Sequence, residues 1–243
     1  MDISRFLTAL PVYNEAHHID DVLDQVVKYS PDVLVVDDGS SDGSAAILAR
    51  RNDVRIVTHE FNRGYGAALI TAFNYAIEHD FDVIVTIDCD GQHEPKLIRR
   101  FVQLLADTGA DIVSGSRYLS VLEKKSAAPE QRRRINYQIT EYLNQKLRLD
   151  LTDSFCGFKA YRVEALKQLE LTETGYAMPL ELWVQAVCHG LTIVEEPVPL
   201  IYLDEKRSFG GSLDDPEARL NYYHSVLDRS FARLPSTCSQ FTE

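Results

Sequence analysis

Five short runs rich in Val and Ile alternate with helix-like segments over residues 1–118, and this alternation is the strongest constraint on the fold. The apolar runs span 6–10, 32–38, 54–60, 82–88 and 110–116. The helix candidates between them span 18–29, 41–51, 66–79 and 95–108. Strand, helix and strand at this spacing predict an α/β fold, with a mostly parallel sheet covered by helices on both faces. Ligands bind such sheets beyond the carboxyl ends of the strands, so we expect the functional residues there.

The alternation ends after residue 118. The segment 120–134 is polar and has no periodicity, which predicts a mobile loop. An extended segment is predicted over 191–203, and the last helix has Asp215 as its N-cap and a proline in its first position. No internal repeat or low-complexity linker interrupts the chain, so we expect a single domain over 1–243. Helices are predicted over about 134–148, 178–189 and 216–232.

Charge and cysteine usage exclude some classes of function. The formal net charge of −12 argues against a general nucleic-acid or anionic-surface binder, because such proteins present basic surfaces. No apolar stretch approaches the ~20 residues that span a bilayer, and the N-terminus enters a strand-like run directly, so we expect no membrane span or targeting peptide. The four cysteines form no CxxC pair, which predicts buried apolar residues in a reducing cytoplasm.

Two aspartates, Asp88 and Asp90, follow the fourth apolar run in the sequence TIDCDGQH. Two carboxylates at a strand end can hold a hard divalent cation, which in turn can neutralise the charge of a diphosphate. An Asp-Gly turn that ends the strand explains the same residues without any ligand. The residues alone leave both interpretations open.

A second carboxylate cluster, VVDDGSSDGS, follows the second run. Asp37, Asp38 and Asp42 would repel a phosphate at the next helix N-terminus, so a nucleoside fits the cluster better. A polar turn with a helix cap explains Ser41 and Asp42, but it does not explain the two adjacent aspartates.

Basic residues also cluster near the expected ligand-binding edge. Arg117 follows the fifth run, where it can bind the phosphate of a donor or an acceptor. The run of Arg132 to Arg134 is either a solvated charge run or part of an anion site. Lys159 or Arg162 is expected to pair with a buried acid. Asp153 and Glu181 are the candidates for that acid.

Six motifs in this order resemble the family 2 glycosyltransferases of the GT-A fold, and among them the polyprenyl-phosphate sugar transferases of the dolichyl-phosphate mannose synthase type. The motifs are PVYNE at 11–15, VVDDGSSDGS, NRGYGAA, DCDGQH, GSR at 115–117 and DSFCGFKAYR from Asp153. The resemblance implies a GT-A domain with a nucleotide-sugar-binding half over 1–118. It implies an acceptor-side half over 119–243 that ends in a C-terminal helical segment.

The resemblance also implies roles for individual residues. A nucleotide pocket would include Pro11, Tyr13, Glu15, Val36 and Asp38, with Gln92 close to the diphosphate. Asp88 and Asp90 would hold Mg²⁺ or Mn²⁺. Arg117 and Arg207 would bind phosphate groups.

The implied reaction is inverting, metal-dependent transfer of a hexose from a GDP-mannose or UDP-glucose type of donor to a polyprenyl phosphate. Transfer to a soluble or protein hydroxyl is the alternative, and it would require a general base, for which Asp153 and Glu181 are the candidates. A catalytically silent nucleotide-sugar-binding protein is a third possibility. A lipid acceptor would place a cytoplasmic chain peripherally on the inner face of the membrane. A homo-oligomer is compatible with all three of these functions.

Two departures from the family pattern fall on the acceptor side. The related synthases carry GESK in the C-terminal loop, whereas this chain has GGSL with Leu213 in place of the lysine. A Ser-Arg dipeptide of the relatives is replaced by Tyr137-Gln138. The acceptor therefore stays open on sequence grounds.

Overall fold

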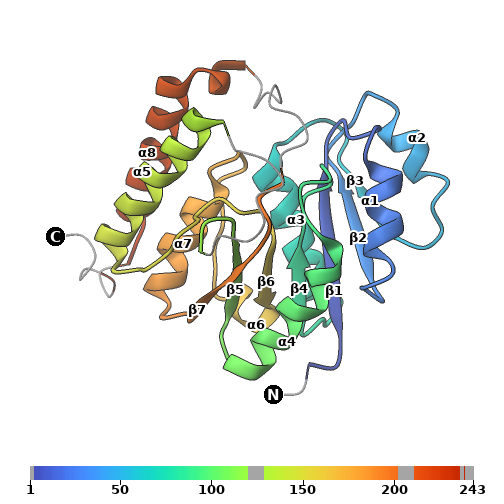
Figure 1. Cartoon of the computed structure of the whole chain (residues 1–243), viewed down its shortest axis with the longest axis horizontal. Coiled ribbons are helices and arrows are strands. Elements are labelled where there is room, and N and C mark those ends of the chain that lie inside the picture. The colour runs from blue at the N-terminus through green and yellow to red at the C-terminus, as the bar shows by residue number, and fades with distance from the viewer. Residues whose placement is uncertain (1–2, 120–128, 202–210, 236–237, 239–243) are drawn as a thin grey trace.

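The computed structural model describes residues 3–119, 129–201, 211–235 and 238. Its centre is a seven-stranded sheet in the order β3-β2-β1-β4-β6-β5-β7 (Figure 1). Strand β6 is antiparallel to both neighbours, and the other pairs are parallel, so the predicted mostly parallel α/β sheet is confirmed. The strands are β1 (Phe6–Val12), β2 (Val33–Asp37), β3 (Arg55–Thr58), β4 (Val83–Thr86), β5 (Ile112–Ser116), β6 (Lys159–Arg162) and β7 (Ile193–Pro197).

Helices cover both faces of this sheet because alternate strand residues point to opposite sides. Leu7 and Ala9 of β1 join one apolar core, and Leu10 and Val12 join the other. The first core includes residues of α3 (Tyr65–Glu78), α5 (Glu130–Leu147), α6 (Val163–Leu166), α7 (Met178–Cys188) and α8 (Pro216–Ala232). The second includes residues of α1 (Ile19–Val26), α2 (Ser44–Leu48) and α4 (Ile98–Thr108). Two short 3₁₀ helices, η1 (Pro95–Leu97) and η2 (Gly211–Asp214), precede α4 and α8.

The C-terminal helix follows its prediction closely. Helix α8 spans Pro216–Ala232, and the Asp215 carboxylate accepts a hydrogen bond from the Ala218 amide at 2.8 Å. Among the described residues, no helix combines the length and hydropathy that a bilayer crossing requires.

Two predictions for the second half were wrong in detail. Helix α5 begins at Glu130, so Arg132 to Arg134 lie on a helix and not in a loop; an acidic first residue suits the positive end of the helix dipole. The remainder of the predicted loop, 120–128, lies outside the described residues. The extended segment pairs as a strand only over Ile193–Pro197, since proline cannot donate a ladder hydrogen bond.

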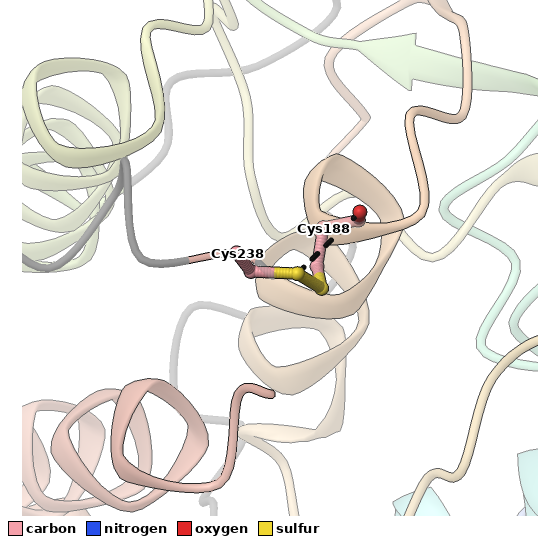
Figure 2. Close-up of a disulfide and its surroundings, with 2 residues drawn as sticks. All are labelled: Cys188 and Cys238. Carbon is pink, nitrogen blue, oxygen red and sulfur yellow. Dashed lines mark hydrogen bonds between the residues drawn. A yellow bond between two sulfur atoms is a disulfide. The ribbon is translucent and has the colours of Figure 1, made fainter. Parts of the chain in front are cut away.

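Two of the four cysteines are not the separate buried thiols that the sequence predicted. Cys89 and Cys156 are buried and free, whereas Cys188, at the end of α7, forms a disulfide with Cys238 (Figure 2). The two residues are 50 positions apart, with 5.4 Å between their Cα atoms. Because two of the cysteines form a disulfide, cysteine usage no longer supports the prediction of a reducing compartment.

The disulfide predicts a redox-dependent stability. Cross-linking residues 50 positions apart stabilises a fold by about 4 kcal/mol in the chain-entropy model. We expect Cys238→Ser to lower the free energy of unfolding by about 2–4 kcal/mol, measured by urea denaturation without reductant. Dithiothreitol should destabilise the wild type by a similar amount and leave the variant unchanged. An equal effect of dithiothreitol on both proteins would contradict the disulfide.

Candidate active site

A cleft of about 360 Å³ opens at the carboxyl ends of the parallel strands. Its walls combine residues that follow β1, β2, β4 and β5 with residues of α3, α5 and α8. Most of the site residues predicted from the sequence line this one cleft: Pro11, Tyr13, Glu15, Asp38, Asp88, Asp90, Gln92 and Arg117. Helical residues that were not predicted as site residues also line it, among them Asn136, Arg219 and Tyr223.

The two aspartates after β4 are held in place by neighbouring groups. The Tyr65 hydroxyl donates a hydrogen bond to Asp88 Oδ1 at 2.9 Å, and His93 Nε2 lies 3.3 Å from Asp88 Oδ2. Asp90 Oδ1 accepts from the Gln92 amide at 3.0 Å. Burial and the Asp88 carboxylate raise the pKa of Tyr65, so its proton stays available to Asp88. These contacts orient the carboxylates toward the same cleft.

Gly157, just before β6, provides the space that Asp88 occupies. A Cβ atom at position 157 would overlap the Asp88 carboxylate. The position of the Asp88 carboxylate therefore requires a glycine at 157. The sequence alone did not show this requirement, because Gly157 and Asp88 are far apart in the chain.

Asp38 holds a loop in place and also forms part of the cleft wall. It is 3 % exposed. Its Oδ1 lies 2.6 Å from His59 Nδ1, and its two oxygens accept hydrogen bonds from the amides of Arg63 and Gly64. Asp38 thus fixes the loop that leads into α3. Val36 is completely buried in β2 and does not line the cleft, and neither does Arg63.

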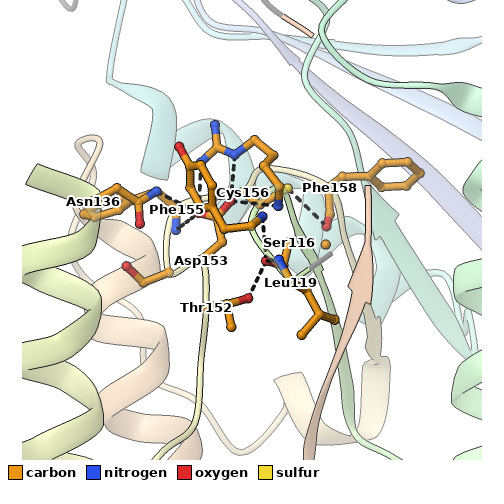
Figure 3. Close-up of polar contacts among 12 residues, drawn as sticks. Ser116, Leu119, Asn136, Thr152, Asp153, Phe155, Cys156 and Phe158 are labelled. Atoms are coloured by element: carbon orange, nitrogen blue, oxygen red, sulfur yellow. Dashed lines mark hydrogen bonds and ion pairs between the residues drawn. The ribbon is translucent and has the colours of Figure 1, made fainter. Parts of the chain in front are cut away.

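Arg117 and Asp153 form a bidentate ion pair at the other side of the cleft. Arg117 donates from Nε at 2.6 Å and from Nη2 at 2.9 Å, and Asn136 Nδ2 donates to the same carboxylate at 2.8 Å. Figure 3 shows the network around Asp153. Burial of Asp153 favours a higher pKa, but the charge and hydrogen bonds of Arg117 outweigh it, so the pKa is lowered. Asp153 is therefore ionised and has no exposed surface.

This pairing corrects the expected partners of the buried acids. Lys159 is buried and donates to the Cys156 carbonyl, and Arg162 donates to the carbonyls of Leu105 and Ala110. The cation that engages Asp153 is Arg117, which follows a different strand.

Glu181 lies outside the cleft. Its carboxylate accepts hydrogen bonds from the Thr172 amide and hydroxyl and from the Glu173 amide, at 2.7–2.8 Å. It is 2 % exposed and borders a separate cavity beneath α8. The structure therefore does not bring Glu181 together with the other predicted site residues. Arg207 lies outside the described residues.

Two pairs of helical residues in the cleft wall share a simple spacing. Arg132 and Asn136 are four residues apart on α5, and Arg219 and Tyr223 are four apart on α8, so each pair lies on one helix face. A start of α5 at Glu130 would have revealed the first pair from the sequence. Nothing local in the sequence shows that the face of α8 with Arg219 turns toward a cleft.

Similarity to known proteins gives this cleft a family. The glycosyl transferase family 2 model matches residues 8–170, which contain most of β1, the strands β2 to β6 and both carboxylate clusters. The chain belongs to glycosyl transferase family 2. It is therefore a glycosyltransferase, and its sheet and C-terminal helix conform to the GT-A fold expected from the sequence.

Individual relatives of this family 2 glycosyltransferase cover most of its length. It is 31% identical to a polyprenol monophosphomannose synthase of Mycolicibacterium smegmatis over 80% of this chain and 76% of the relative. It is 32% identical to an undecaprenyl-phosphate mannosyltransferase of Micrococcus luteus, over 85% and 88%. Glucosyl-3-phosphoglycerate synthase from Mycobacterium tuberculosis, solved with uridine diphosphate, shares the fold with a TM-score of 0.73 at 21% identity, over 96% of this chain and 82% of the other.

Proposed function

We propose that this glycosyltransferase transfers a hexose from a nucleotide-diphosphate sugar, of the GDP-mannose or UDP-glucose type, to a polyprenyl phosphate. The observation that carries the proposal is one cleft that is lined by carboxylates following β1, β2 and β4, by three arginines and by apolar side chains. The two relatives above are named for polyprenyl-type acceptors, which supports the same acceptor class.

The donor would occupy the end of the cleft formed by Pro11, Tyr13, Glu15 and Asp38, with Gln92 near its diphosphate. Asp88 and Asp90 would hold a divalent cation such as Mg²⁺ or Mn²⁺, which supplies positive charge to the leaving diphosphate. The two aspartates suit such a cation, because Mg²⁺ is commonly held by one or two carboxylates together with substrate phosphates. Among the described residues, no group of three or more His, Cys, Asp or Glu side chains is arranged to hold a metal ion.

Gly157→Ala tests this carboxylate pair. The new methyl group would displace Asp88, and a misplacement of ~1 Å can cost about 10²-fold in rate. We expect a loss of that order in sugar transfer, measured as kcat/KM for the donor. Gly190→Ala is the control, because its Cβ would meet nothing within 4 Å and would cost stability through its positive φ. Equal activity losses in the two variants would contradict the role of Gly157.

The reaction itself would form a bond between an acceptor oxygen and the anomeric carbon as the bond from that carbon to the diphosphate breaks. The acceptor would approach from the side opposite the diphosphate, which inverts the anomeric configuration. Arg117 lines the cleft, and its Nε and Nη2 are held by Asp153, so its guanidinium is fixed before substrates bind. A fixed charge of this kind stabilises the transition state without reorganisation.

The acceptor end favours a lipid phosphate over a hydroxyl. Phosphate oxygens are ionised at neutral pH and need no strong general base, whereas a hydroxyl does. Neither carboxylate considered as a base is placed to act as one, because Asp153 is fully buried against Arg117 and Glu181 is outside the cleft. The cleft also has apolar lining suited to the first isoprene units, which would place the enzyme at a membrane surface. These residues are Ile135, Phe155, Pro179 and Ile201.

The test is transfer of label from GDP-mannose, UDP-glucose or UDP-N-acetylglucosamine to undecaprenyl phosphate in detergent, with and without Mn²⁺. The proposal expects label that extracts into butanol and depends on added lipid. Label found only in water-soluble product, in the presence of soluble hydroxyl acceptors, would favour the alternative acceptor. Stabilisation by nucleotide sugars without any transfer would favour a silent binding protein.

A further inference from the structure

We infer that Arg219, on the C-terminal helix α8, positions the phosphate group of the acceptor. This inference rests on the proposed function, and it assigns the binding of the lipid's anionic end to a single residue of α8. The two helices α5 and α8 lie together at the side of the molecule away from β1, β2 and β3 (Figure 1), whereas the proposed nucleotide contacts lie at the ends of β1 and β2.

Arg219 lies in the wall of the cleft. Its side chain lines the cleft although the residue is only 3 % exposed. Nη1 donates a hydrogen bond to the Leu213 carbonyl at 3.0 Å, which ties the guanidinium to η2. A phosphate bound in the cleft would meet this guanidinium at the cleft wall. An arginine fixed in a cleft wall is suited to this, because its planar fork matches phosphate oxygens.

Arg219 belongs to a cluster made by two helices. Arg132 of α5 lines the same cleft, and Tyr223 lies one turn further along α8. Burial raises the pKa of Tyr223 to about 12, while Arg219 and Arg132 both act in the opposite direction on this phenol. Arg132, Arg219 and Tyr223 all line the cleft, so two arginines from two different helices contribute positive charge to its wall.

The surroundings of the cluster indicate an amphipathic ligand. Ile135 follows Arg132 by three residues on the same helix and lines the cleft. The ring of Phe155 packs against that of Tyr223, with 4.8 Å between centroids. A phosphate at the arginines would have apolar carbon directly beside it, as a prenyl phosphate requires.

The geometry also answers the question raised by Leu213. The sequence lacks a basic residue at this position, but the Leu213 carbonyl binds the guanidinium of Arg219, six residues later. Arg219, in the first turn of α8, thus brings a positive charge next to the backbone of Leu213.

The experiment compares Arg219→Gln and Arg219→Lys with the wild type in the undecaprenyl phosphate assay. Glutamine can keep the bond to the Leu213 carbonyl but loses the charge, so we expect the KM for lipid to rise by about 10- to 100-fold. Lysine keeps the charge but lacks the planar guanidinium, so the KM of Arg219→Lys for lipid should rise by about threefold or more. The KM for donor should stay within about twofold of the wild type in both, because the nucleotide lies elsewhere. Arg50→Met, at an exposed position outside the cleft, is the charge control and should leave both KM values unchanged.

The outcomes separate the inference from the proposed function. A wild type that transfers no sugar to any polyprenyl phosphate overturns the proposed function. A wild type that does so, with Arg219 variants whose lipid KM is unchanged, overturns the inference alone. A rise in donor KM equal to the rise in lipid KM also overturns it, because Arg219 would then serve the diphosphate or the fold. If Arg219→Gln does not fold, the lysine variant decides by the same comparison.

Discussion

Asp90→Asn is expected to lower kcat/KM for sugar transfer by about 100-fold or more. A cation that offsets charge on a leaving diphosphate contributes several kcal/mol, and each ~1.4 kcal/mol is tenfold in rate. Asp90 is one of only two carboxylates that we propose for the cation, so no third carboxylate compensates. The measurement is a titration of activity with Mn²⁺ and Mg²⁺ at a donor concentration well below KM, where the rate reports kcat/KM. The variant should need a higher metal concentration and reach a lower plateau.

Asp21→Asn is the matched control, because Asp21 is exposed on α1 and outside the cleft. It removes the same charge and should leave the metal titration unchanged. Full activity of Asp90→Asn at the wild-type metal concentration would remove the metal assignment while leaving the family membership intact. Thermal denaturation of both variants without ligand should give similar midpoints, which separates a folding defect from a binding defect.

Asp153→Asn is expected to lower the free energy of unfolding at pH 7 by about 3–5 kcal/mol, because it leaves Arg117 partly buried without its counter-charge. The pKa of Asp153 is lowered in the folded state, so the stabilisation is complete above the unfolded pKa of about 3.9. This stabilisation is lost as the pH falls through the pKa of Asp153 in the folded state. The difference between wild type and variant, measured by urea denaturation, should therefore shrink in strong acid.

Two further variants make this prediction specific. Asp150→Asn removes an exposed carboxylate three positions away and should change stability by less than about 0.5 kcal/mol. The double variant Arg117→Met/Asp153→Leu removes both charges and should recover much of the stability, because an apolar pair can replace a buried ion pair. It should not recover transfer. An active double variant would contradict the role of Arg117 in the cleft.

Much of the fold could be predicted from the sequence because strand and helix periodicity are local properties. The alternation over residues 1–118 specified five parallel strands, and Asp215 with Pro216 specified the start of α8. The same local pattern placed Asp38, Asp88 and Arg117 at strand ends, and parallel strands bring their carboxyl ends to one edge. The sequence by itself therefore determined the edge of the sheet on which the site lies.

Tertiary structure alone decided how those residues are used. Strand β6 enters between β4 and β5, which brings Gly157 against Asp88, and no periodicity within a four-residue strand predicts that insertion. The pairing of Arg117 with Asp153, 36 residues apart, and the position of Arg219 in the cleft wall depend on how distant elements pack. A local sequence pattern specifies which face of an element is apolar, but the partner of a polar side chain on that element is set by long-range packing.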